Sequence, residues 1–321
     1  MALKRHGGNP IITRAEIPDI PPWIIDATAV FNPGAVVHED RIKLILHVQT
    51  RSWETFLVMA QSRDGVDFTV SERIIELNDL ANAGKIVHHI SAPRVTQVED
   101  NYYIIVTMDM ETGCRPGLIR TLDFKTFDFL GLIADKDVRN GVLFPERIGD
   151  MYLRLERPND VLLPNGLTSG REIVLAESVD LLNWRPQQVV MFGRPHYWDE
   201  HIGSGPPPLK TAEGWLHIYH GMAVQDSGAS ICQVGAVLLD LEDPSRVLAR
   251  TRNNILEPRE TYEMTGRAPN IVIPSGLVVE QYDAEGFAVM DSKVYLYYGA
   301  ADTCIGLATA KVADIIEACH D

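Results

Sequence analysis

Short runs of apolar residues, separated by polar and turn-forming residues, follow one another along almost the whole chain. β-Branched and aromatic residues dominate these runs, and Asp, Asn, Gly and Glu interrupt them, which is typical of strands joined by hairpins. Clear examples are residues 42–46, 102–106, 215–219 and 294–298. Only residues 312–318, near the end of the chain, show the apolar spacing of a helix. The pattern therefore predicts an all-β fold with a short C-terminal helix.

A longer repeat is superimposed on this alternation. The segments 62–68, 121–127 and 178–184 each place an Asp in a turn, followed by an aromatic residue that returns to the core. Together with a fourth, drifted copy at Asp240, these Asp residues lie 59, 57 and 60 residues apart. A unit of about 60 residues that holds four short strands has the size of a propeller blade. We therefore expect residues 1–321 to form one domain, a five-bladed β-propeller, with a β-sandwich as the alternative.

Composition and charge exclude several classes of function. The chain has 29 Lys and Arg residues against 44 Asp and Glu residues, a formal net charge of −15, which disfavours nucleic acids and anionic membranes as partners. Its four cysteines are too few for a disulfide scaffold and form no C-x-x-C pair for zinc. No apolar segment is long enough to span a membrane, and the N-terminus lacks the apolar stretch of a secretory signal. We expect a cytoplasmic protein.

Polar residues at strand ends are the candidates for a functional site, because the inner strands of a propeller converge on a central funnel. Those next to Gly, Pro or aromatic residues are Asn32, Arg94, Arg139, Arg157, His201, His220, Tyr262, Glu263 and Asp302. A single Arg on a strand is usually solvated or ion-paired, but three cationic candidates at matching places in successive units indicate an anion site. Planar guanidinium groups bind a tetrahedral oxyanion such as phosphate through paired hydrogen bonds.

Several motifs resemble those of glycoside hydrolase family 130. They occur in order over nearly the whole chain, at residues 31–33, 92–95, 140–146, 156–158, 202–208, 214–221, 262–263 and 298–303. The resemblance implies a five-bladed β-propeller that acts on β-mannosides. Most members of the family are inverting phosphorylases, which use inorganic phosphate to release mannose 1-phosphate, and some are hydrolases.

The resemblance also implies roles for individual residues. Arg139, Arg157 and His220 fall where the phosphorylases hold phosphate, whereas Asn32 and Asp302 fall where they hold the mannosyl unit. Arg side chains neutralise a dianionic nucleophile, and amide and carboxylate groups form hydrogen bonds with sugar hydroxyls. Phosphate itself attacks the anomeric carbon, so the protein needs only one acid and the cations that position the phosphate. We expect no metal and no cofactor, with phosphate as the co-substrate. Further candidates for substrate binding are Arg94 and Tyr262.

Ala92 is the main departure from the family pattern. It occupies the position of the Asp that serves as general acid, and an alanine cannot donate a proton. General-acid assistance accelerates a reaction by roughly 10²–10⁴-fold, so the chain as it stands should be badly impaired. Either Ala92 was engineered in place of the acid, or this branch of the family uses another acid, for which the candidates are Asp26, Asp109 and Glu263.

Two histidines also depart from the pattern. His201 stands where the phosphorylases usually have Lys or Arg, at the phosphate site, and His47 stands where many members keep a sugar-binding Arg. A histidine is neutral or only partly charged near pH 7. These changes are therefore expected to affect phosphate affinity and the substrate linkage.

Three functions are consistent with these observations. The first is a glycosyltransferase-type enzyme, a β-mannoside phosphorylase that acts on short manno-oligosaccharides. The second is an inverting β-mannosidase, which would need a second carboxylate to activate water, with Glu263 as the candidate base. The third is a non-catalytic carbohydrate-binding propeller that has lost catalysis through Ala92. Family members often assemble, so a homo-oligomer is a further expectation.

Overall fold

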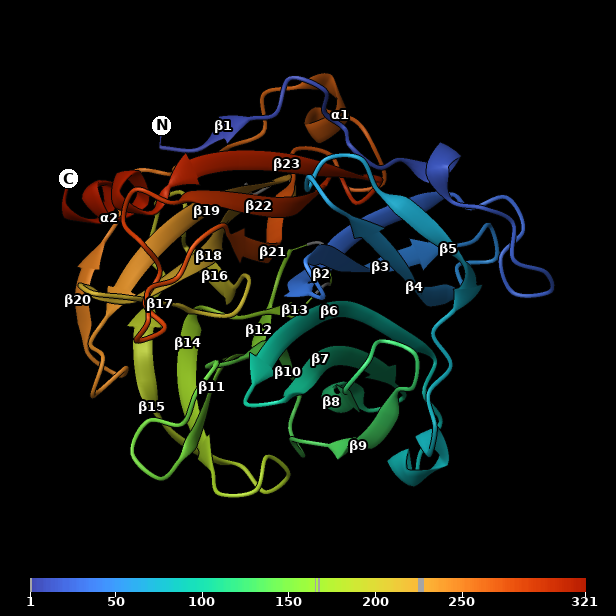
Figure 1. The fold of residues 1–321 in the computed structure, drawn as a ribbon, viewed down its shortest axis with the longest axis horizontal. Helices are drawn as coiled ribbons and strands as arrows, with labels where there is room; N and C mark the ends of the chain where they lie inside the picture. The colour runs from blue at the N-terminus through green and yellow to red at the C-terminus, as the bar shows by residue number, and fades with distance from the viewer. Residues whose placement is uncertain (1, 165, 167, 225–227) are drawn as a thin grey trace.

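The computed structural model describes residues 2–164, 166, 168–224 and 228–321, and it consists mainly of antiparallel strands (Figure 1). The first sheet contains β2 (Ala29–His38), β3 (Arg41–Gln49), β4 (Thr55–Ser62) and β5 (Thr69–Ile74). The second contains β6 (His89–Val98), β7 (Asn101–Met110), β8 (Gly113–Thr121) and β9 (Asp128–Leu132). The third contains β10 (Val138–Leu143), β11 (Tyr152–Pro158), β14 (Glu172–Ser178) and β15 (Arg185–Phe192).

Two further sheets complete the ring. The fourth contains β16 (His201–Ser204), β17 (Leu209–Thr211), β18 (Gly214–Val224), β19 (Ser230–Leu239) and β20 (Val247–Arg250). The fifth contains β21 (Val272–Val279), β22 (Lys293–Ala300), β23 (Cys304–Lys311) and β1 (Lys4–Arg5). The smaller elements are β12 (Val161–Leu162), β13 (Thr168–Ser169), the 3₁₀ turns η1 (Arg14–Glu16) and η2 (Leu80–Ala83), and the helices α1 (Thr261–Met264) and α2 (Val312–His320).

The five sheets are the blades of a β-propeller, as the repeat predicts. Their first strands β2, β6, β10, β16 and β21 gather around the centre of the molecule (Figure 1). The ring is closed by the N-terminus, because β1 pairs with β23 through Lys4 opposite Thr309 and Arg5 opposite Ala308. The predicted C-terminal helix is also confirmed, as α2. The five-bladed fold is therefore established along with its closing strand, which the sequence pattern does not reveal.

The repeated Asp residues have the same structural role in four blades. Asp64, Asp123, Asp180 and Asp240 each lie in the turn before the last strand of a blade. In each turn the Asp side chain accepts hydrogen bonds of 2.8–3.1 Å from two backbone N–H groups further along the chain. Such Asx turns satisfy the backbone of a tight reversal. The spacing of about 60 residues thus reflects the same turn in four successive blades.

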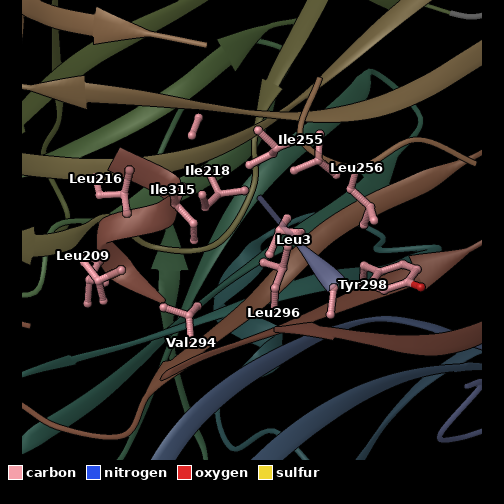
Figure 2. Packing of buried hydrophobic residues seen from close by; sticks show 14 of the residues in the cluster. Leu3, Leu209, Leu216, Ile218, Ile255, Leu256, Val294, Leu296, Tyr298 and Ile315 are labelled. Carbon is pink, nitrogen blue, oxygen red and sulfur yellow. The ribbon is translucent and has the colours of Figure 1, made fainter. Parts of the chain in front are cut away.

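The hydrophobic core is divided into five clusters, and each lies between two neighbouring blades. Figure 2 shows the cluster between the fourth and fifth blades, where Leu3 of the N-terminal segment packs among Leu256, Leu296 and Tyr298. Ile315 of α2 joins the same cluster. The two chain ends therefore stabilise the same blade interface. All four cysteines are buried and unpaired.

Within the described part of the chain, no helix has both the length and the apolarity needed to cross a membrane.

Candidate active site

A cavity of about 410 Å³ is lined by residues from all five blades. Seven residues predicted for the site line it: Asn32, His47, Ala92, Arg139, Arg157, His220 and Asp302. The candidate acid Asp109 lines it too. These residues are up to 270 positions apart in the sequence, and the propeller brings them together because each blade contributes its innermost strands.

Three matching backbone irregularities present side chains to this cavity. The pairing of the inner strands β2, β6 and β10 with their neighbours is interrupted between residues 31 and 34, 91 and 94, and 139 and 142. At each bulge one residue has a positive φ: 47° at Asn32, 49° at Ala92 and 55° at Asn140. Asn and Asp adopt this left-handed region far more readily than alanine does. Ala92 therefore occupies a position whose backbone favours Asn or Asp.

Two glycines make room for site residues by close approach. A Cβ atom on Gly203 would lie 2.5 Å from Cε1 of His220 and 2.8 Å from Oδ1 of Asn140. A Cβ atom on Gly299 would collide with Oδ1 of Asn32. Glycine is thus required at both positions to seat these side chains against the neighbouring blade.

Arg157 is buried at the cavity wall and has no ion-pair partner among the described residues. Its residue is 8% exposed, and its Nη2 donates a 3.3 Å hydrogen bond to Oδ1 of Asn159. No carboxylate among the described residues forms an ion pair with it, and burial, with the nearby Arg139, lowers its pKa to about 10. Buried charges in native proteins are normally paired. An unpaired buried guanidinium at a cavity wall is available to bind an anion.

Arg139 lies beside Arg157 at the more open part of the cavity. Its Nη2 is 3.6 Å from Oδ1 of Asp109, and both side chains are more than a third exposed. Oδ1 of Asp109 also accepts a 2.7 Å hydrogen bond from Sγ of Cys114. The two arginines therefore supply positive charge to one wall, with Asp109 partly balancing the outer one.

Two histidines of the cavity lining, His47 and His220, lie in surroundings that favour the neutral imidazole. Burial lowers the pKa of His47 to about 3, and burial together with Arg157 lowers the pKa of His220 far below its usual value. Nδ1 of His220 has no hydrogen-bond partner among the described residues. His220 can therefore give or accept a hydrogen bond at the site, while the arginines carry the charge.

Asp302 is a second carboxylate of the cavity lining. It lies in the turn between β22 and β23, where Ala301 and Asp302 both have a φ of 48°. Burial raises the pKa of Asp302 to about 6, although the nearby Arg267 opposes this shift. A carboxylate with few internal partners is available to sugar hydroxyls.

Asp302→Asn should stabilise the folded protein above pH 6 by about 1–3 kcal/mol. The native state holds the proton of Asp302 up to about pH 6, whereas the unfolded chain releases it near pH 4. Stability from this group is therefore present below pH 4 and lost as the pH rises to 6. Urea unfolding at pH 4 and pH 8 measures the effect, and an equal change at both pH values would contradict it.

Two predicted residues lie behind the cavity rather than in its lining. Arg94 is 2% exposed, and its Nε donates a 2.7 Å hydrogen bond to the carbonyl oxygen of Gly205. Its Nη1 donates to the carbonyl oxygens of Ala92 and Pro93, each at 3.2 Å. His201 is also buried outside the lining, and burial lowers its pKa. Arg94 therefore bridges two blades, and neither Arg94 nor His201 is among the residues that line the cavity.

Glu263 and Tyr262 lie where the N-terminal strand β1 closes the propeller, and they are not among the residues that line the cavity. The prediction that both belong to the site is therefore corrected. Arg5 of β1 donates to both carboxylate oxygens of Glu263, each at 2.8 Å, and Tyr298 Oη donates at 2.8 Å. Burial opposes ionisation, but these donors and two backbone N–H groups lower the pKa of Glu263. Tyr262 Oη is 3.2 Å from that of Tyr298. Glu263 is therefore placed to hold the N-terminal strand.

Asp26, another candidate acid, also lies outside the lining. Its side chain is 51% exposed and pairs with Arg51. It is therefore a surface residue.

Glu263→Gln should lower the free energy of unfolding by about 1–3 kcal/mol, since Arg5 would lose its counter-ion. Activity per folded molecule, measured well below the melting temperature, should change little. Chemical denaturation and a pH–rate profile check both parts. If Glu263→Gln abolished activity without loss of stability, Glu263 would be the base and this assignment would fail.

The cavity lining also includes residues outside the predicted set, among them Asn140, Trp53 and Arg267. Asn140 follows Arg139 at the third bulge, and its equivalence to Asn32 could have identified it. Trp53 lies in the β3–β4 turn and Arg267 in the segment after α1, and both line the cavity. Neither lies at the end of an inner strand, so the pattern of polar residues at strand ends does not include them.

The sequence is similar to those of known mannoside phosphorylases. The sequence profile of glycoside hydrolase family 130, described as beta-1,4-mannooligosaccharide phosphorylase, matches residues 2–321. A 1,2-beta-oligomannan phosphorylase of Thermoanaerobacter sp. (strain X514) is 31% identical, covering 98% of both chains. A beta-1,4-mannooligosaccharide phosphorylase of Ruminococcus albus is 29% identical, covering 98% of this chain and 89% of the relative.

A solved structure extends the match to three dimensions. The beta-1,2-mannobiose phosphorylase of Listeria innocua, in complex with beta-1,2-mannobiose, superimposes with a TM-score of 0.83. It is 25% identical and covers 100% of this chain and 99% of that one. The match to the profile over nearly its full length, together with the first relative, shows that this chain belongs to glycoside hydrolase family 130.

Proposed function

We propose that this protein is an inverting β-mannoside phosphorylase that cleaves short manno-oligosaccharides with inorganic phosphate and yields mannose 1-phosphate. The observation that carries the proposal is Arg157, a buried guanidinium at the cavity wall with no ion-pair partner among the described residues. Phosphate would supply the missing negative charge. The activities named for the relatives are of the same class.

The residues of the cavity lining would bind two different ligands, phosphate and the mannosyl unit. Arg139 and Arg157 would hold phosphate on one wall, with a hydrogen bond from His220. Asn32 and Asp302 would hold the mannosyl unit between that wall and the leaving sugar. A phosphate oxygen then forms a bond to the anomeric carbon as the bond to the glycosidic oxygen breaks on the opposite face. The leaving oxygen must take up one proton, and the arginines preorganise the phosphate for attack.

The source of that proton is the feature in which this chain is unusual. Ala92 lies in the cavity at the second bulge and has no proton to give. Asp109 is the other proposed acid that lines the cavity, and its Oδ1 lies 3.6 Å from Nη2 of Arg139. Turnover by the chain with Ala92 should therefore be slow.

Ala92 also favours a second candidate function, a carbohydrate-binding propeller without turnover. The hydrolase alternative has less support, because its candidate base Glu263 lies outside the cavity and is fully occupied by hydrogen bonds. Linkage stays open, since the relatives are named for both 1,2- and 1,4-linked substrates. A cytoplasmic location and homo-oligomerisation stay predictions.

Product analysis tests the proposal. The protein with Ala92 and its Ala92→Asp variant are incubated with β-1,2- and β-1,4-manno-oligosaccharides, with and without phosphate. Phosphate-dependent formation of mannose 1-phosphate, followed by ³¹P NMR, supports the phosphorylase. Free mannose formed equally without phosphate would indicate a hydrolase, and binding without turnover by both proteins would indicate the binding function.

A further inference from the structure

Trp53 is a large aromatic side chain held at the mouth of the cavity. It lies in the turn between β3 and β4, is 64% exposed, and has a φ of 66°. A bulky residue rarely adopts this left-handed backbone. Its N–H donates a 3.2 Å hydrogen bond to the carbonyl oxygen of Thr50, which fixes the turn. Ligand cavities are lined mainly by apolar and aromatic side chains, so an exposed indole in this cavity lining is placed to contact a ligand.

Arg267 lies against one face of this indole. The Cζ atom of its guanidinium is 4.6 Å from the ring centroid of Trp53 and 5.6 Å from that of Phe31, within the range of cation–π contact. The backbone N–H of Arg267 donates a 3.1 Å hydrogen bond to Oγ1 of Thr303. Ala268 likewise donates to the carbonyl oxygen of Ala301 at 3.1 Å. Arg267 is therefore anchored to the turn that carries Asp302.

The exposure of the lining residues shows which end of the cavity is closed and which is open to solvent. His47, Arg157 and His220 are 5–8% exposed and form its closed part, whereas Trp53 is open to solvent. A mannosyl unit that reaches phosphate at Arg157 must occupy the closed part. The rest of the oligosaccharide must then extend towards the mouth, where Trp53 and Arg267 lie.

We infer that Trp53 and Arg267 form the subsite for the leaving sugar, an inference that rests on the proposed function. The indole face that Arg267 leaves uncovered stacks on the apolar face of the pyranose ring next to the cleaved bond. The guanidinium of Arg267 donates hydrogen bonds to hydroxyls of the same ring. The pair selects for a second sugar ring and makes no contact with phosphate.

Ligand titrations of the intact protein test this subsite. Isothermal titration with β-linked mannotriose and, separately, with mannose 1-phosphate is carried out on the unmodified protein, Trp53→Ala, Trp53→Phe and Arg267→Ala. Trp23→Ala is the matched control, because Trp23 is 49% exposed, packs against Phe56 and lies outside the cavity. Thermal unfolding confirms that each variant is folded.

We expect Trp53→Ala to weaken mannotriose binding by about tenfold or more, which corresponds to at least about 1.4 kcal/mol. Its affinity for mannose 1-phosphate should stay within about twofold. Trp53→Phe should recover most of the loss, and Trp23→Ala should show none.

Three results would overturn the inference. Unchanged mannotriose affinity in both Trp53→Ala and Arg267→Ala, with tight binding by the unmodified protein, would remove the subsite but leave the proposed function intact. Equal weakening of mannotriose and mannose 1-phosphate by Trp53→Ala would place Trp53 at the mannosyl unit instead. If the unmodified protein bound no β-mannoside at all, the proposed function would fail together with this subsite.

Discussion

Ala92→Asp should raise kcat/KM for phosphorolysis of a manno-oligosaccharide by roughly 10²–10⁴-fold, the usual contribution of a general acid. Residue 92 lines the cavity on the second inner strand, between the bulges of Asn32 and Asn140. A carboxyl group there can deliver a proton towards the leaving oxygen. Initial rates of mannose 1-phosphate formation, with and without the substitution, measure the gain.

The control for this prediction is Ala92→Asn. Asn has the shape of Asp and tolerates the positive φ of 49° equally well, but its amide cannot act as an acid near neutral pH. Both variants should be at least as stable as the protein with Ala92, and only Ala92→Asp should gain activity. A similar gain in activity from both substitutions would show that backbone strain at residue 92, rather than the lack of a proton donor, limits the activity of the protein with Ala92.

Arg157→Ala, made in the Ala92→Asp background, should lower kcat/KM for phosphate by about 10²–10³-fold, since loss of a buried charge partner typically costs several kcal/mol. Sugar affinity should change by less than about threefold, because Asn32 and Asp302 lie on other blades. For Arg157→Lys, kcat/KM for phosphate should lie between the values of the parent and Arg157→Ala, since lysine keeps the charge but lacks the planar guanidinium. Steady-state kinetics with phosphate as the varied substrate measure these differences.

Measurements of stability distinguish a loss of phosphate binding in Arg157→Ala from a loss of folding. Arg157 is buried without an ion pair among the described residues, so Arg157→Ala should not destabilise the protein in phosphate-free buffer. Added phosphate should raise the melting temperature of the parent but not of Arg157→Ala. A variant that kept both its phosphate-induced stabilisation and its kinetics would show that Arg157 does not hold phosphate.

The fold could be predicted because its repeating features are local. The Asx turns at Asp64, Asp123 and Asp180 occur at the same place in the first three blades, so their spacing gives the blade size. The closing strand β1 could not be found this way, because two residues at the N-terminus carry no periodic pattern.

The candidate site could be predicted only in part, because local motifs are visible in the sequence whereas contacts between distant segments are not. Asn32 and Ala92 lie at bulges that precede a proline, so the sequence marks them. Arg94 and Glu263 stand in equally clear motifs, but their functional groups turn to Gly205 and Arg5, far away in the sequence. Such contacts between distant segments are decided by the packing of the blades and leave no local signature.

The position of bound phosphate is the most direct test of the account. A crystal structure of the protein with inorganic phosphate and a β-mannoside should show an oxygen of the anion about 3 Å from the guanidinium nitrogens of both Arg139 and Arg157, with the mannosyl ring against Asn32 and Asp302. Phosphate held elsewhere, or a sugar ring occupying the place beside Arg157, would contradict it.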